Sequence, residues 1–193
     1  MRRLAITLCL FISSLAAQLA AMPAQVIIIP CAEVDAQGNL TQQGLERAGA
    51  LVAYIALTQA PVAFGKPIAI FAARPVPNAA PYPLAPPENT ESCMQTIAPT
   101  ALFFKKPIHS GYALLQEIQL ASFILNKQLY NGKTVLICWH IEGMQALAIA
   151  LGVAGAPVFP AGVSNLTWVI NYAPAIALIE LEQDLLFSDA GPI

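Results

Sequence analysis

Cys31 and Glu33 are the first residues along the chain whose side chains are suited to chemistry. They lie in the stretch Val26–Glu33, which opens with four β-branched residues and therefore predicts a short strand buried on both faces. Such strands belong inside parallel sheets, where ligands bind beyond the carboxyl ends of the strands. A thiolate is a nucleophile when its pKa is lowered, and a carboxylate can transfer protons. We therefore expect both side chains at a place where chemistry is done.

The same stretch resembles the start of the histidine phosphatase (phosphoglycerate mutase-like) superfamily. In that family the strand ends in Arg-His-Gly/Ala-Glu, and a helix follows that begins Leu-Thr/Ser-x-x-Gly-x-x-Arg-Ala. Here the tetrad is Pro30-Cys31-Ala32-Glu33, and Leu40–Ala48 reads Leu-Thr-Gln-Gln-Gly-Leu-Glu-Arg-Ala. The resemblance implies that the family's arginine has become Pro30 and that its phosphoryl-accepting histidine has become Cys31.

Three further motifs carry the resemblance, in the order that the family has them. Val135–Met144 reads as a strand that runs into His140, at the position of the family's second histidine, which helps to hold the phosphoryl group. Ser92–Thr96 is similar to Arg-x-x-Gln/Glu-Thr, with Ser92 in place of the arginine that grips phosphate. Asn165–Trp168 resembles an Asp-Arg-x-Trp motif, with asparagine in place of the aspartate.

These replacements remove charges that phosphoryl transfer needs, because electrostatic stabilisation usually dominates such catalysis. Neither Pro30 nor Ser92 carries a charge, and losing one donor of this kind costs on the order of 100-fold in rate. We therefore expect a histidine-phosphatase-like protein without the family's phosphohistidine chemistry. It would be a pseudoenzyme or a module that binds a ligand, such as a phosphorylated small molecule, or a protein partner.

An altered phosphomonoester hydrolase is the alternative that the same residues leave open. If the fold places Cys31 beside His140, as the family's two histidines lie, the thiol would be a nucleophile and the imidazole its base. Glu142 or Glu33 would then act as an acid or orient the imidazole. Arg74 follows a predicted strand and would offer a replacement cation to a weak phosphatase that works through His140.

Zinc would accept Cys31 and His140 together with Glu33 or Glu142 as mixed ligands. These residues are far apart in the sequence, and no Cys-x-x-Cys spacing supports a metal site, so we assign no metal and no cofactor. The candidate site then consists of two groups of residues. The candidate catalytic residues are Cys31, His140 and Glu142, and the candidate ligand-binding residues are Glu33, Arg74 and Ser92.

The elements expected to position these side chains alternate between strands and helices. Further strands are expected at Ile68–Ala72, Ala101–Phe104, Thr134–Trp139, Thr167–Tyr172 and Ile176–Leu181, and helices at Gln42–Ala56, Ser92–Ala98, Gly111–Leu129 and Met144–Leu151. The last two strands suit a hairpin around Ala173-Pro174, and the proline-dense Pro75–Asn89 predicts a loop. This alternation predicts an α/β protein, a three-layer α/β/α sandwich with a mostly parallel central sheet.

The first helix has a predicted N-cap at Thr41 and a predicted buried stripe that begins at Leu45. Arg47 is expected on the surface of this helix, with a structural role. His109 is expected in a surface loop.

Residues 1–21 have the pattern of a secretory signal peptide, with Arg2 and Arg3, an apolar run and an alanine-rich end. We expect export, to a periplasm or out of the cell, with cleavage after Ala21 or Ala24, and a single domain over residues 22–193. An uncleaved membrane anchor is the rival interpretation, but the apolar run is short for a span.

Removal of this segment leaves seven basic residues against 11 acidic ones, a net charge near −4. This balance argues against nucleic acid and against anionic membranes as partners. Three cysteines remain, Cys31, Cys93 and Cys138, so at least one is unpaired in an oxidising compartment.

Overall fold

A six-stranded sheet forms the centre of the computed structural model, which describes residues 22–59, 61–75 and 91–190. The strand order is β3-β2-β4-β1-β5-β6. The strands are β1 (Gln25–Pro30), β2 (Pro67–Ala72), β3 (Ile108–His109), β4 (Thr134–Trp139), β5 (Leu166–Asn171) and β6 (Ala177–Glu182). The first four pair in parallel, whereas β5 is antiparallel to both β1 and β6. The prediction of a mostly parallel sheet is confirmed.

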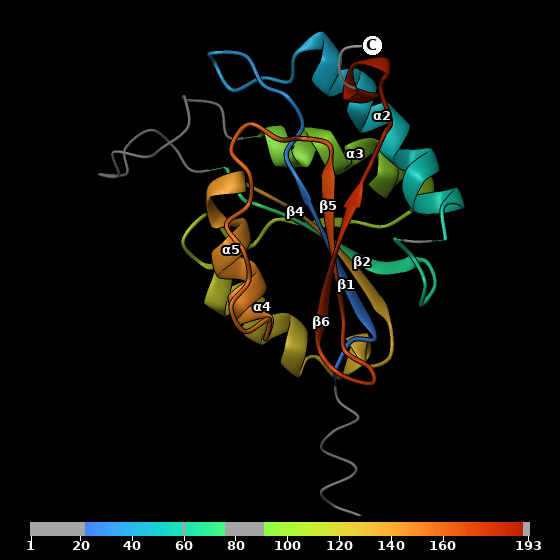
Figure 1. Ribbon diagram of the computed structural model, residues 1–193, viewed down its shortest axis with the longest axis vertical. Helices are drawn as coiled ribbons and strands as arrows, with labels where there is room; N and C mark the ends of the chain where they lie inside the picture. The colour runs from blue at the N-terminus through green and yellow to red at the C-terminus, as the bar shows by residue number, and fades with distance from the viewer. Residues whose placement is uncertain (1–21, 60, 76–90, 191–193) are drawn as a thin grey trace, which may run out of the picture.

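Helices cover both faces of this sheet, as Figure 1 shows. They are α2 (Gln42–Leu57), α3 (Ser92–Phe104), α4 (Glu117–Asn126) and α5 (Ile141–Ala150), with short 3₁₀ turns at Gln128–Tyr130 and Phe187–Ala190. α2 packs beside α3, and α4 packs beside α5 on the opposite face. The three layers are those of an α/β/α sandwich, as the alternation of strands and helices predicts.

The centre of the core is formed by β1 and β4, which are buried along their whole lengths. Their paired register runs from Gln25 opposite Thr134 to Pro30 opposite Trp139. Both strands therefore end at the same level, and Cys31 and His140 follow directly from these ends. This arrangement results from the apolar runs themselves, because a strand that is apolar on both faces is stable only between two layers of helices.

The start of α2 packs tightly against the loop that follows β1. The Thr41 side chain caps the helix by accepting a hydrogen bond from the Gly44 N–H, as predicted, and the Thr41 N–H bonds to the Glu33 carbonyl at 2.9 Å. A Cβ on Gly44 would collide with the Glu33 carbonyl oxygen, so only glycine allows this approach. The glycine and threonine of the helix motif thus hold the Cys31–Glu33 segment in place.

The buried face of α2 contains most of the predicted stripe, at Ala48, Leu51 and Ile55, but differs from it at Leu45. Leu45 is 57% exposed, and Arg47, expected on the surface, is 2% exposed and faces inward with Tyr54. The reason is the contact at Gly44, which fixes the rotation of the helix about its axis and places residues three and four positions further along in the interior.

Two other predicted elements are wrong in type or extent. Ala101–Phe104, expected as a strand, is the last turn of α3, since a short apolar run does not distinguish a strand from a helix. The helix expected from Gly111 begins at Glu117, because residues 111–116 form an irregular segment in which Leu115 has a positive φ. His109 is exposed as predicted, but it lies in β3 and not in a loop.

The late strands form the predicted hairpin, with β5 paired to β6 from Leu166 opposite Glu182 to Asn171 opposite Ala177. The segment predicted as a signal peptide and almost all of the proline-dense loop lie outside the described residues. Within the described ranges, no helix has the length and apolar character that a membrane span requires.

Candidate functional site

A cavity of about 320 Å³ opens at the carboxyl ends of β1 and β4. Its lining comes from the segment after β1, the start of α3, the start of α5 and the loop before β5. The lining residues are Cys31, Ala32, Glu33, Val34, Gly38, Ser92, His140, Ile141, Glu142, Gly162 and Ser164. Five of the six candidate site residues therefore line this one cavity. It lies at the carboxyl ends of parallel strands, where ligands bind in sheets of this kind.

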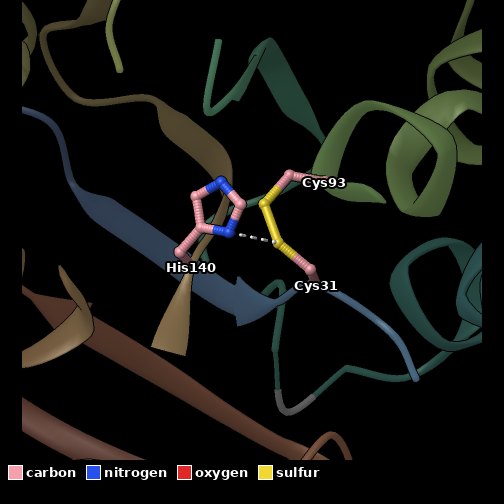
Figure 2. A group of neighbouring side chains, drawn as sticks. All are labelled: Cys31, Cys93 and His140. Carbon is pink, nitrogen blue, oxygen red and sulfur yellow. Dashed lines mark hydrogen bonds between the residues drawn. A yellow bond between two sulfur atoms is a disulfide. The ribbon is translucent and has the colours of Figure 1, made fainter. Parts of the chain in front are cut away.

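A disulfide between Cys31 and Cys93 forms one wall of the site (Figure 2). The two Cα atoms are 4.5 Å apart, although 62 positions separate the residues in the sequence. The imidazole of His140 points toward this bond, with its Nδ1 3.7 Å from the Cys31 Sγ. The structure thus brings Cys31 beside His140, as the resemblance implies, but with the thiol bonded to Cys93.

Local backbone contacts explain how these three residues meet. The Cys31 N–H donates to the Trp139 carbonyl at 3.1 Å, which continues the ladder between β1 and β4 by one residue. His140 is the N-cap residue of α5, and its carbonyl accepts from the Gly143 N–H at 3.0 Å. Cys93 lies in the first turn of α3.

Thr96 fixes α3 to the segment after β1. Its Oγ1 accepts a hydrogen bond from the Ala32 N–H at 2.9 Å and donates one to the Ser92 carbonyl at 2.7 Å. Thr96 itself is fully buried. One hydroxyl therefore joins the residue after Cys31 to the residue before Cys93, and it does so independently of the disulfide.

Arg47 neutralises the carboxylate of Glu33 beneath the cavity. Its guanidinium bonds to both Glu33 oxygens, with the closest pair at 2.6 Å, and to both Asp189 oxygens at 2.7 and 2.9 Å. Burial alone would lower the pKa of Arg47, but the bonds to Asp189 and Glu33 outweigh it and raise this pKa above its ordinary value. Arg47 is therefore a fixed structural cation and is not available to a ligand.

The surroundings of His140 favour its neutral form. Burial lowers the pKa of its imidazole, and the nearby carboxylates of Glu142 and Glu117 only partly oppose this effect. A neutral imidazole offers one nitrogen lone pair to a ligand, a proton or a metal ion. It offers no positive charge to a phosphate group.

The cavity lacks the cations that a phosphate site needs. Of the described residues that line it, none is Lys or Arg, while Glu33 and Glu142 are both acidic. Arg74, proposed from the sequence as a replacement cation, is exposed and does not line the cavity. Ser92 lines it, but a neutral hydroxyl does not replace a guanidinium.

The sequence did not indicate that Glu117 supports the site. Glu117 is buried, and its Oε1 accepts hydrogen bonds from the Trp139 indole N–H and the Leu115 N–H, both at 3.0 Å. This pair holds the strand end that carries His140.

The pairing of Cys93 was also left open by the sequence, because three cysteines allow three different pairs. The structure leaves Cys138 as the free cysteine among the described residues. It is fully buried in β4, and burial strongly raises the pKa of its thiol. Cys138 is therefore an inert core residue.

Comparisons with known proteins show the fold. No protein-family model matches the chain, and no curated protein matches its sequence. Among solved structures, the chain is similar to the crystal structure of a protein from Agrobacterium tumefaciens described as a putative phosphohistidine phosphatase, SixA, with 18% identity and a TM-score of 0.52. The match covers 83% of this chain and 99% of that one. The chain thus shares the α/β fold of a protein described as a phosphatase, over nearly all of that protein's length.

Proposed function

We propose that this chain is an exported member of the histidine phosphatase superfamily that has lost the phosphohistidine chemistry and binds a ligand or partner at the Cys31–Cys93–His140 site. One observation carries the proposal. The residue at the place of the family's nucleophile is bonded to Cys93. A disulfide sulfur has no free thiolate and cannot accept a phosphoryl group.

The charge of the cavity supports the same conclusion. A phosphate dianion entering it would meet the Glu142 carboxylate and the neutral imidazole of His140, and the described residues that line the cavity include no arginine to offset them. Phosphoryl transfer depends on donors that are already in place before the reaction. The ligand is therefore better matched as a neutral or cationic group than as the phosphorylated molecule that the family resemblance suggests.

Export is the second part of the proposal, and it rests on the sequence of residues 1–21. Cleavage after Ala21 fits the hydrogen bonds better than cleavage after Ala24. The Met22 carbonyl accepts from the Gly132 N–H at 3.0 Å, and the Ala24 N–H donates to the Lys133 carbonyl at 3.0 Å. Cutting after Ala24 would remove both bonds. Mass spectrometry of the chain recovered from an expressing bacterium would test the cleavage site. A mass that corresponds to a chain beginning at Met1 would contradict export with cleavage.

The test of the lost chemistry is a titration with tungstate or orthovanadate, together with phosphomonoester hydrolysis, on the oxidised protein. We expect no saturable oxyanion binding and no turnover above that of a His140→Ala variant. His109→Ala is the matched control, since His109 is the other histidine of the chain and is exposed. Turnover that disappears in His140→Ala and persists in His109→Ala would overturn the proposal.

A hydrolase that uses Cys31 and His140 is the second candidate, and the 3.7 Å approach of the two side chains favours it. It requires a free thiol, so its activity must appear only after reduction of the disulfide. Hydrolysis that is gained on reduction and lost in Cys31→Ser would support it. Equal rates in the oxidised and reduced protein would exclude it.

A further inference from the structure

Three side chains that bind soft metal ions converge at the site. The ligand atoms of Cys31, Cys93 and His140 all lie within 4.8 Å of one another, and all three residues are buried. They come from the ends of two strands and the first turn of a helix, as Figure 2 shows. The sequence suggested Glu33 or Glu142 as a further zinc ligand, but Glu33 is held by Arg47. Cys93 takes that place.

We propose that the reduced form of this chain binds Zn²⁺ through the thiolates of Cys31 and Cys93 and through Nδ1 of His140, and that the disulfide closes this site. Zinc sites with three protein ligands of this kind keep a fourth position for water or for a substrate. That position would face the cavity, which both Cys31 and His140 line.

The distances fit a tetrahedral ion. With zinc–sulfur and zinc–nitrogen bonds of about 2.3 and 2.0–2.1 Å, a thiolate and an imidazole nitrogen of one site lie about 3.6 Å apart. The Cys31 Sγ and the His140 Nδ1 are 3.7 Å apart before any metal enters. The Cys93 Sγ lies within 4.8 Å of the imidazole nitrogen, and reduction of the disulfide permits the two sulfur atoms to separate.

Contacts other than the disulfide also hold the scaffold of the site. Thr96 joins Ala32 to Ser92 by hydrogen bonds, and the Cys31 N–H is bonded to Trp139. We therefore expect both cysteines to keep their backbone positions when their sulfur bond is cleaved. The two thiolates also cancel the charge of the zinc ion, so that a buried site carries no net charge.

Opening the site is a thiol–disulfide exchange with a dithiol reductant. A thiolate of the reductant attacks Sγ of Cys31, which lines the cavity, and Cys93 leaves as the thiolate. The second thiol of the reductant then attacks the mixed disulfide, releases Cys31 and becomes part of the reductant's own disulfide. The two electrons pass from the dithiol to the chain, and zinc binding displaces the protons that the two thiols hold.

The experiment compares one protein in two redox states. Zn²⁺ affinity is measured by competition with a chromophoric chelator on the oxidised chain and on the chain reduced with a phosphine, and Co²⁺ replaces Zn²⁺ as a spectroscopic probe. We expect one Zn²⁺ per reduced chain and a Co²⁺ spectrum with thiolate charge-transfer bands and tetrahedral d–d bands. The oxidised chain should bind at least about 100-fold more weakly, since the loss of outer-shell partners alone costs 10–100-fold.

Variants identify the ligands. Cys31→Ser, Cys93→Ser and His140→Gln should each lower the affinity of the reduced protein by at least about 100-fold, whereas His109→Gln and Cys138→Ala should leave it unchanged. Circular dichroism checks that each variant is folded, and the redox comparison on the unaltered chain stands if one of them is not. Equal binding by the oxidised and reduced chains, or no binding by the reduced chain, would overturn the proposal.

Discussion

The disulfide between Cys31 and Cys93 should supply a large part of the stability of this fold. It closes a loop between residues that are 62 positions apart. In the chain-entropy account, a loop of this length contributes about 4 kcal/mol, between the values of about 3 for 15 residues and about 4.7 for 100. Because domains are typically stable by only about 5–15 kcal/mol, the reduced protein should remain folded with a narrow margin.

Urea unfolding of the oxidised and the phosphine-reduced protein, followed by circular dichroism, measures this contribution. With a urea dependence of about 2 kcal/mol per molar, the loss corresponds to a midpoint lowered by roughly 2 M. Metal is removed with a chelator, so that zinc does not stabilise the reduced form. The double variant Cys31→Ala/Cys93→Ala is the control, and its midpoint should not respond to reduction. The reasoning is refuted if reduction leaves the midpoint of the unaltered chain unchanged, or lowers that of the control equally.

The other two predictions concern the ion pairs beneath the cavity. Arg47→Met leaves the buried carboxylate of Asp189 without its partner, so it should lower the free energy of unfolding by about 3–5 kcal/mol. The same change at the exposed Arg74 should alter it by about 0.5 kcal/mol or less, and similar losses in urea unfolding at both sites would contradict the role of Arg47. The hydrogen bonds from Arg47 hold the pKa of Asp189 below its ordinary value of 3.8 despite burial. This stabilisation is complete above that value and is lost as the pH falls through the lower pKa of the folded state. Urea midpoints measured from about pH 6 downward should therefore fall less steeply in Asp189→Asn than in the unaltered chain, and parallel curves would speak against the pair.

The fold is predictable from the sequence because its strongest signals are physical and local. The β-branched run at Val26–Ile29 and the apolar stretch at Thr134–Trp139 fix two buried parallel strands. The ends of these strands then bring Cys31 and His140 to one edge of the sheet. Thr41 and Gly44 mark the helix start for reasons of capping and close approach.

The interior of the site was harder to predict because it depends on contacts between distant segments. Nothing local in the sequence says that Cys93 pairs with Cys31, since three pairings satisfy the same count of cysteines. The sequence predicted a surface position for Arg47, because a charged residue is almost never buried unless partners are present. Its second partner, Asp189, lies 142 positions away. The order and spacing of residues within one helix do not carry this information.

The proposed loss of phosphoryl transfer rests on more than the residue at position 31. The described part of the chain holds two arginines, and one is engaged by Glu33 and Asp189 while the other is exposed away from the cavity lining. A histidine at position 31 would still face an acidic cavity, in which no described lining residue is a cation that could bind phosphate. What remains at the site is two sulfur atoms and a neutral imidazole, within 4.8 Å of one another. Once the disulfide is reduced, the two thiolates and the imidazole are good ligands for a soft or borderline metal ion, and they are poorly suited to bind a hard oxyanion. On the proposed function, these replacements change the kind of chemistry that the site favours.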